Sequence, residues 1–248
     1  MEETQKKYKY GLIGKNISYS FSRQYFTEKF KKLKLEDCEY VNFDLQTIEE
    51  FSKMDFKAIN GFNVTIPYKE QILKFLDTID DQAKEIGAVN TIKITKNNQL
   101  VGYNTDFFGF QESLKPFLKP HHKKALVLGT GGASKAILFV LKKLNIDCLV
   151  VSRNPVKAQI SYQDITKKVI EKHTLIINCT PLGTYPDVDK SPNIPYLFIT
   201  NQHLLYDLIY NPEKTSFLSK GEKQGAAICN GLKMLELQAE KAWEIWSL

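Results

Sequence analysis

The sequence predicts an α/β protein with two domains, an N-terminal α/β domain followed by a domain built on a doubly wound parallel sheet. Short apolar runs alternate with stretches of helical periodicity along the chain, which is the pattern of strands connected by helices. The runs form two series, and a polar, proline-containing segment at residues 119–123 precedes the second. With 248 residues, 43% of them hydrophobic, the chain can bury one large core or two modest ones.

In the first series we expect strands at residues 8–13, 40–45, 58–66, 90–95 and 100–103. Phe26, Phe30 and Leu33 recur at helical spacing after the first strand and predict an amphipathic helix that buries them. Pro67 stops the third strand, and a helix can begin there because proline is tolerated at the first helical position. The polar residues 96–99 between the last two strands indicate a hairpin.

In the second series a helix at residues 107–118 precedes strands at residues 125–128, 148–152, 175–179, 204–209 and 226–229. Such nearly continuous apolar runs are typical of a parallel sheet with helices on both faces. The chain closes with a helix whose apolar stripe we interpret as core packing, formed by Leu232, Leu235, Ala239, Ala242 and Trp246.

The charge balance excludes some partners. The 34 Lys and Arg residues exceed the 28 Asp and Glu residues by six, and the excess is spread along the chain. We therefore expect no nucleic-acid partner, whereas a mild positive balance suits an anionic small ligand. The N-terminal residues are polar and no run approaches about 18 apolar residues, so we expect no leader and no membrane segment.

Cysteine and histidine spacing argues against a metal site. Cys38, Cys148, Cys179 and Cys229 show no ligand spacing, and the last three sit in apolar runs where a thiol behaves as a buried hydrophobe. A reducing, cytoplasmic compartment is the natural interpretation. The four histidines form no H-x-x-x-H or H-x-H pattern, so we expect each to lie at the surface or in a loop.

The segment ALVLGTGGASKAILFVLKKL predicts a strand, a glycine-rich turn and a helix in succession, the context of a Rossmann dinucleotide fingerprint. Gly129 suits the tight turn, and Gly131 lets the backbone approach a pyrophosphate. The third glycine of the fingerprint is replaced by Ser134. A turn that binds no phosphate is the alternative.

The next strand ends in Ser152-Arg153-Asn154, where an enzyme specific for NAD would usually offer an acidic residue to the ribose. Arg153 together with Lys157 can instead hold a 2′-phosphate, which favours NADP over NAD. Taken alone, an arginine after a strand is more often a solvated loop charge. Its position after the glycine-rich turn makes it a candidate for cofactor selectivity.

Four polar patches interrupt the first hundred residues beside apolar strands, at residues 18–22, 63–69, 87–91 and 102–106. Each has an ordinary structural interpretation. Ser20 and Ser22 suit helix caps, and Asp106 suits the first turn of a helix because of the helix dipole. Any one of these interpretations is the better one when its patch is taken in isolation.

Together the patches resemble the shikimate dehydrogenase family through GLIGKNISYSFS, GFNVTIPYK, IGAVNT and GYNTD, and the resemblance continues through GTGGAS, SRN, NCTPLG, YDLIYNP and NGLKMLELQAEKAW. The resemblance implies an oxidoreductase of aromatic amino acid biosynthesis, usually cytoplasmic, that reversibly reduces 3-dehydroshikimate to shikimate with NADPH. It also implies a substrate domain at residues 1–105 completed by a C-terminal helix at 230–248, an NADP-binding domain at 106–229, and a cleft between them.

The resemblance also implies site residues. Lys69 would be the catalytic general acid/base, assisted by Asp106, since hydride transfer at a carbinol carbon requires the hydroxyl proton to move. The substrate would be bound by Ser20, Ser22, Asn63, Thr65, Asn90, Tyr210 and Gln238. NADP(H) would be bound at the pyrophosphate by Gly129, Gly131, Gly132, Ala133 and Ser134, at the adenosine phosphate by Ser152, Arg153, Asn154 and Lys157, and near the nicotinamide by Thr180, Leu182, Gly231 and Met234.

Two departures from the family pattern concern the cofactor side. Lys233 stands where the family usually has glycine, which would put a bulky charge near the nicotinamide-side turn. The stretch at 154–175 is also shorter than usual, so we expect a helix and a strand to be trimmed. A relative acting on quinate and a non-catalytic NADPH-binding module remain alternatives, and the assembly would be a monomer or a homodimer.

Overall fold

The computed structural model describes residues 8–18 and 20–247 and divides into two compact units. Unit 1 comprises Met1–Thr105 and Ala239–Leu248, and unit 2 comprises Asp106–Gln238. The division passes through the final helix α7 (Leu232–Ser247), whereas the sequence led us to place residues 230–248 together with the first unit. Each unit carries its own six-stranded sheet.

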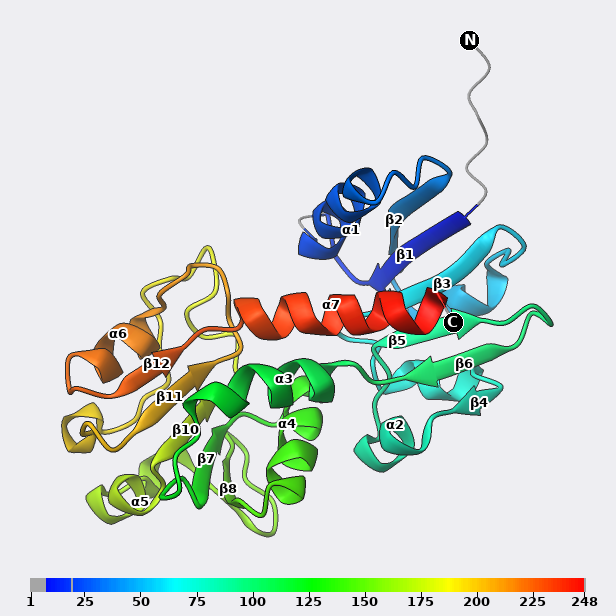
Figure 1. The fold of residues 1–248 in the computed structure, drawn as a ribbon. Helices are drawn as coiled ribbons and strands as arrows, with labels where there is room; N and C mark the ends of the chain where they lie inside the picture. The colour runs from blue at the N-terminus through cyan, green and yellow to red at the C-terminus, as the bar shows by residue number, and fades with distance from the viewer. Residues whose placement is uncertain (1–7, 19, 248) are drawn as a thin grey trace. The chain divides into compact units, whose positions relative to one another are not determined.

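Unit 1 contains a mixed sheet in the order β2-β1-β3-β5-β6-β4 (Figure 1). Its strands are β1 (Tyr8–Gly14), β2 (Cys38–Asp44), β3 (Ile59–Val64), β4 (Thr78–Ile79), β5 (Thr91–Ile94) and β6 (Leu100–Tyr103). Neighbours are parallel except that β5 runs antiparallel to β3 and β6. The antiparallel pair of β5 and β6 is the hairpin that the sequence predicts.

One face of this sheet is covered by α1 (Phe21–Lys32) and the C-terminal part of α7. The Trp246 indole donates to the carbonyl of Ile92 at 3.0 Å. A Cβ at Gly61 would lie 2.3 Å from the same indole nitrogen, so the close approach of helix and strand requires glycine. Leu33, expected in the core, is 50% exposed because α1 ends one residue before it.

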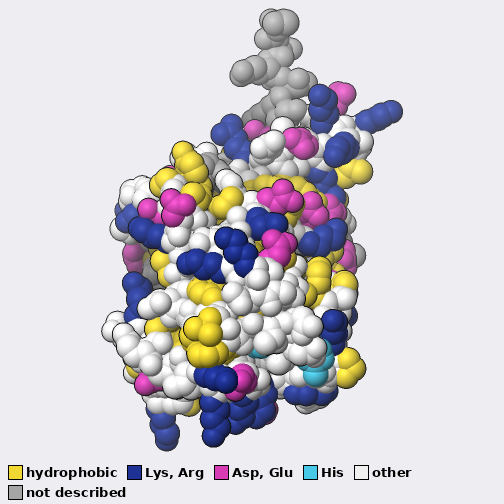
Figure 2. All heavy atoms as spheres, turned by 90° about the vertical axis from the view of Figure 1, so that its left-hand side faces the viewer, with side chains coloured by type: hydrophobic (Ala, Val, Ile, Leu, Met, Phe, Trp, Pro, Cys, Tyr) yellow, Lys and Arg dark blue, Asp and Glu magenta, His cyan; other side chains and the backbone are white. Residues whose placement is uncertain are grey.

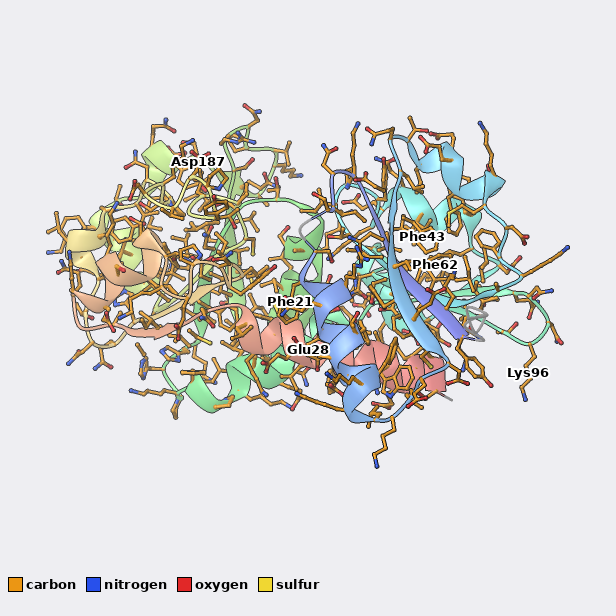
Figure 3. The ribbon with its side chains drawn as sticks, turned by 90° about the horizontal axis from the view of Figure 1, so that it is seen from above. Phe21, Glu28, Phe43, Phe62, Lys96 and Asp187 are labelled. Atoms are coloured by element: carbon orange, nitrogen blue, oxygen red, sulfur yellow. The ribbon has the colours of Figure 1, made fainter. Side chains whose placement is uncertain are left out.

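The opposite face is covered by the short helices η1 (Ile48–Lys53), η2 (Gln71–Phe75) and α2 (Asp81–Ile86). Phe43 and Phe62 pack edge to face there at 5.4 Å (Figure 3). No α-helix begins at Pro67, contrary to expectation. The chain instead makes a turn that is closed by the Tyr68 amide, which donates to the Thr65 carbonyl at 2.9 Å, and η2 follows it.

Unit 2 contains an all-parallel sheet in the order β12-β11-β10-β7-β8-β9, the strand order of the Rossmann fold. Its strands are β7 (Lys124–Leu128), β8 (Asp147–Val151), β9 (Gln159–Ile160), β10 (Leu175–Asn178), β11 (Leu204–Asp207) and β12 (Ala227–Cys229). The predicted α/β class and the doubly wound sheet are confirmed.

The α-helices of unit 2 are α3 (Asp106–Leu114), α4 (Gly132–Lys143), α5 (Lys167–Lys172), α6 (Ser216–Glu222) and the beginning of α7. Residues 154–175 contain the strand β9 and the helix α5, whereas residues 152–158 between β8 and β9 form no helix. The expected loss of a strand is therefore wrong, and a helix is absent from this connection, as expected. The β8–β9 connection can be short because β9 pairs only with the last two residues of β8. Leu232, placed in the apolar stripe of the last helix, is 37% exposed.

The four histidines lie in turns or loops, as expected, although His122, His173 and His203 are buried there. Each Nδ1 atom hydrogen bonds with the backbone. His122 Nδ1 accepts from the Lys119 amide and His203 Nδ1 accepts from the Thr200 amide, whereas His173 Nδ1 bonds with the Val169 carbonyl. Burial is possible because these backbone partners satisfy the rings.

Among the cysteines, Cys148 is exposed, although its apolar run predicts a buried thiol. Within the described residues, no helix is long and apolar enough to cross a membrane. Lys and Arg side chains are interspersed with acidic ones over much of the face shown in Figure 2, with a group of basic side chains at its lower edge.

Candidate functional site

The topology of unit 1 gathers the predicted polar residues at one edge of its sheet. The carboxyl ends of β1 and β3 lie at this edge, since Ile13 pairs with Val64. The start of β5 and the end of β6 lie there too, because Thr91 pairs with both Asn63 and Tyr103. The residues that follow or precede these strand ends are Ser20, Ser22, Thr65, Lys69 and Asn90.

A buried chain of hydrogen bonds runs along this edge. The Tyr40 phenol donates to Asn63 Oδ1 at 2.8 Å, and Asn63 Nδ2 donates to Thr91 Oγ1 at 3.2 Å and to the Asn90 carbonyl at 3.3 Å. The Asn90 side chain accepts from the Thr105 amide at 2.6 Å and donates to Thr105 Oγ1 at 3.1 Å. All five residues are buried, so these bonds replace hydration that the polar groups have lost.

Lys69 lies half-buried in the turn that follows β3. The buried ring of the preceding Tyr68 anchors this turn, and its phenol donates to the carbonyl of Leu45 at 2.7 Å. The Lys69 carbonyl accepts from the Val89 amide at 2.8 Å. The backbone of Lys69 is therefore fixed from both sides, between the patches at residues 63–69 and 87–91.

Ser20 and Ser22 lie at the start of α1. Tyr19, which belongs to the same polar patch, lies outside the described residues. Ser20 occupies the N-cap position but its hydroxyl makes no capping hydrogen bond, so capping does not explain this side chain. Ser22 lies near the buried phenol of Tyr40: burial raises the pKa of Tyr40, and Ser22 opposes the increase.

The connection between β1 and α1 is held by β2. The two carboxylate oxygens of Asp44 on β2 accept hydrogen bonds from amides of this connection, from Asn16 at 2.8 Å and from Ile17 at 3.2 Å. Asn42 Nδ2 donates to the Ile17 carbonyl at 2.8 Å. The start of α1, which carries Ser20 and Ser22, is therefore held to the neighbouring strand.

Asp106, Tyr210 and Gln238 belong to unit 2, whereas Lys69 belongs to unit 1. Asp106 begins α3 and is 6% exposed. One turn further on, a Cβ at Gly109 would lie 2.5 Å from the Met234 carbonyl, so α3 and α7 approach closely beside Gln238. Tyr210 is half-buried and follows β11.

The glycine-rich turn of unit 2 lies between β7 and α4. Gly129 has φ 104°, and a Cβ there would lie 3.0 Å from Thr180, so this position requires glycine. Gly131 is the N-cap of α4, and a Cβ there would meet no atom within 4 Å. The first amides of a helix, here those of Gly132 and Ala133, have no acceptor within the helix and suit an anion.

Ser134, predicted to face the pyrophosphate, is buried and its hydroxyl donates to the Gly131 carbonyl at 2.6 Å. The hydroxyl is therefore engaged inside the first turn of α4. It replaces the third glycine of the fingerprint because a small buried side chain fits where the helix packs on the sheet.

The loop after β8 carries the predicted adenosine-phosphate residues. Ser152 is buried and its Oγ accepts from the Asn154 amide at 3.2 Å. Arg153, Asn154 and Lys157 are exposed. Burial raises the pKa of the Tyr162 phenol, and the positive charge of the nearby Arg153 opposes this increase.

The ends of β10 and β11 share a buried network that sequence reasoning missed. Asp207 accepts from Thr215 Oγ1 at 2.6 Å, from Asn178 Nδ2 at 3.0 Å and from the Ile209 amide at 3.1 Å. Asn178 Oδ1 in turn accepts from Thr180 Oγ1 at 2.6 Å. Burial raises the pKa of Asp207 to about 6, although these hydrogen bonds oppose the increase. Polar residues at the ends of adjacent strands were the available signal.

The turn before α7 is closely packed. A Cβ at Gly231 would lie 2.0 Å from the Leu208 carbonyl, and Asn230 Oδ1 accepts from the Leu232 amide at 3.2 Å. Met234 is buried one turn into the helix. Lys233 is exposed and pairs with Glu236 at 3.3 Å, which partly neutralises the charge expected beside this turn.

Comparison with known proteins identifies relatives across both units. The family model for the shikimate dehydrogenase substrate binding domain matches residues 12–92. The shikimate dehydrogenase (NADP(+)) of Clostridium botulinum strain Hall is 39% identical over 252 residues, which cover 97% of each chain.

Solved structures give the same result. The crystal structure of shikimate dehydrogenase from Aquifex aeolicus has a TM-score of 0.86 and 35% identity, covering 99% of this chain and 93% of that one. The structure of shikimate 5-dehydrogenase from Thermus thermophilus, in complex with NADP(H) and shikimate, has a TM-score of 0.85 and 30% identity, covering 96% and 93%.

Proposed function

Since this chain belongs to the shikimate dehydrogenase (NADP(+)) family, we propose that it catalyses the reversible NADPH-dependent reduction of 3-dehydroshikimate to shikimate. The observation that carries the proposal is the extent of the match, 97% of both chains at 39% identity. Fold similarity alone would not assign a reaction. The relatives' coverage of both units makes a module that retains only cofactor binding a poorer explanation.

The residues present in unit 2 fit NADP(H). The open space at Gly131 and the first amides of α4 suit a pyrophosphate. The exposed Arg153 and Lys157 suit a 2′-phosphate, and residues 152–158 contain no acidic side chain that would repel it. Thr180, Leu182, Gly231 and Met234 would lie toward the nicotinamide, which accepts or gives the hydride when the cofactor is bound.

Lys69 would move the proton in this reaction. As shikimate is oxidised, the hydroxyl on the reacting carbon loses its proton to the Lys69 amine while the hydride leaves that carbon. In the reverse direction the Lys69 ammonium protonates the oxygen. Asp106 would accept a hydrogen bond from a neighbouring substrate hydroxyl and compensate the lysine charge.

The remaining polar groups would bind the substrate hydroxyls and carboxylate. Hydroxyl and amide side chains can satisfy a polyhydroxy carboxylate without a metal. We assign this role to Ser20, Ser22, Thr65, Asn90, Tyr210 and Gln238. Asn63 differs from them, because both N–H groups of its amide are engaged by Thr91 and the Asn90 carbonyl.

The test is the absorbance of NADPH after shikimate and NADP are mixed with the protein. We expect NADPH to accumulate with shikimate and NADP. The reduced cofactor should form more slowly when NAD replaces NADP, as NADH, or when quinate replaces shikimate. Faster turnover of quinate would reassign the substrate. Cofactor binding without turnover of either compound would leave a non-catalytic module instead. We further propose a cytoplasmic enzyme, monomeric or homodimeric, which binds neither nucleic acid nor membrane.

A further inference from the structure

Tyr40 contacts the hydrogen-bond chain of the candidate substrate site, although the sequence gives no reason to place it there. It lies on β2, while Asn63 lies on β3. Its phenol donates to Asn63 Oδ1 at 2.8 Å, and Asn63 Nδ2 donates to the carbonyl of Asn90 at 3.3 Å. We propose that Tyr40 is a positioning residue for the substrate, acting through Asn63 on Asn90. This inference rests on the proposed function.

The orientation of the Asn63 amide depends on Tyr40. A carbonyl oxygen accepts from a phenol and an amide nitrogen does not, so the phenol directs Oδ1 toward β2. The two N–H groups then face Thr91 Oγ1 at 3.2 Å and the Asn90 carbonyl at 3.3 Å. Asn63 keeps no donor for a substrate oxygen, and it instead holds the backbone of Asn90.

The Tyr40 ring is fixed by its neighbours. It stacks on Phe26 with centroids 4.7 Å apart and planes 12° apart, and Trp246 lies 6.4 Å away. Only 4% of the residue is exposed. Because the ring cannot turn away, its hydroxyl holds the Asn63 amide before the substrate arrives. A site ordered in advance loses less conformational entropy on binding.

The test is Tyr40→Phe, which keeps the stacked ring and removes the hydroxyl. We expect the KM for shikimate to increase about 3- to 10-fold, the size of one hydrogen bond. Turnover should stay within about twofold, because the bonds lost are not to the reacting carbon. The KM for NADP should not change.

The matched control is Tyr10→Phe. Tyr10 is also buried, stands opposite Tyr40 in the β1–β2 register, and stacks on Trp246 at 4.9 Å. Its variant should leave both constants unchanged. Thermal unfolding of both variants shows that the assays compare folded proteins.

The pair Asn63→Ala and Asn63→Ala/Tyr40→Phe tests the connection. If Tyr40 acts through Asn63, removing its hydroxyl raises the KM for shikimate less in the Asn63→Ala background than in the wild type. Full additivity, an unchanged KM in Tyr40→Phe, or an equal change in Tyr10→Phe would overturn the inference and leave the proposed function intact. If the wild type neither turns over shikimate nor binds it in calorimetry, both are wrong.

Discussion

Lys69 can be replaced without removing the backbone and Tyr68 hydrogen bonds that hold its turn. Its turn is fixed through the Tyr68 phenol and the Lys69 carbonyl, neither of which needs the ammonium. Lys69→Ala should therefore unfold at the wild-type temperature and lose about 10²-fold or more in turnover, as removal of a general acid/base does. Steady-state kinetics in both directions measure the loss.

The control for Lys69 is Lys74→Ala on η2, whose exposed ammonium pairs with Glu49 at 3.1 Å. It should keep normal turnover. Near-normal turnover of Lys69→Ala would remove Lys69 from the proton transfer, and an equal loss in both variants would point to a general effect on unit 1.

Arg153 is the residue on which cofactor selectivity should depend. Because its guanidinium is exposed, a charge-assisted bond to a 2′-phosphate should be worth about tenfold in binding. Arg153→Ala should raise the KM for NADP by about that factor and leave the KM for NAD unchanged. The comparison is with Lys168→Ala, an exposed basic residue on α5 of the same unit. Equal effects on NADP and NAD would contradict a contact with the 2′-phosphate.

Which residues could be found from the sequence depended on how close their partners lie in the chain. The turn with Lys69 and the turn with Gly129 are continuous motifs, so their residues were predicted together. Tyr40 bonds with Asn63, 23 positions away, and Asp207 with Asn178, 29 positions away. Each of these lies in an apolar strand, and only strand pairing reveals its polar partner.

Two glycines at helix starts in unit 2 should respond to alanine in opposite ways. At Gly131 the added Cβ meets no atom within 4 Å and φ is −70°, so Gly131→Ala should keep its stability and weaken NADP binding. At Gly231 the Cβ would lie 2.0 Å from the Leu208 carbonyl, so Gly231→Ala should lose on the order of 1–3 kcal/mol. Urea unfolding and NADP titration of both variants distinguish these effects. Tight NADP binding by Gly131→Ala would mean that the pyrophosphate does not approach this turn.

Regular elements were predicted more accurately than connections. Apolar runs gave the position of the long strands of both sheets, because burial on both faces leaves a continuous signal. The two-residue strands β4 and β9 were missed, since pairs so short carry no pattern. The prediction of a helix start at Pro67 was also wrong. The turn there is anchored by the hydrogen bond from the Tyr68 phenol to the Leu45 carbonyl, and Leu45 lies in another part of the chain, so the local sequence does not reveal this contact.

At the scale of the whole molecule, two buried groups in unit 2 give opposite dependences of stability on pH. Burial raises the folded-state pKa of Asp207 to about 6. The contribution of this carboxyl to the free energy of unfolding is therefore fully present below the ordinary pKa of 3.8 and is lost as pH rises through 6. Burial, followed by the nearby His121, lowers the pKa of His122 below its ordinary value of 6.5. The contribution of His122 to the free energy of unfolding is therefore present above pH 6.5 and is lost as pH falls.

The geometry explains the sign for His122. Its Nδ1 accepts from the Lys119 amide at 3.0 Å, so a proton on that nitrogen would place two N–H groups against each other. Lys119, His121 and His203 add positive charge around it. In Asp207, by contrast, protonation removes a buried charge and lets the carboxyl remain among its hydrogen-bond partners. Acidification from pH 7 to 5 therefore strengthens one site and weakens the other.

Urea unfolding at pH 7, 6 and 5 separates the two contributions. Between pH 7 and 5 the free energy of unfolding of Asp207→Asn should fall by about 1–2 kcal/mol more than that of the wild type, because the gain from protonating the carboxyl is absent. The free energy of unfolding of His122→Asn should fall less than that of the wild type, since the asparagine Oδ1 can still accept from the Lys119 amide. Asp187→Asn changes an exposed carboxylate and should follow the wild-type profile. A wild-type slope in Asp207→Asn would show that this carboxyl titrates alike in the folded and unfolded chain.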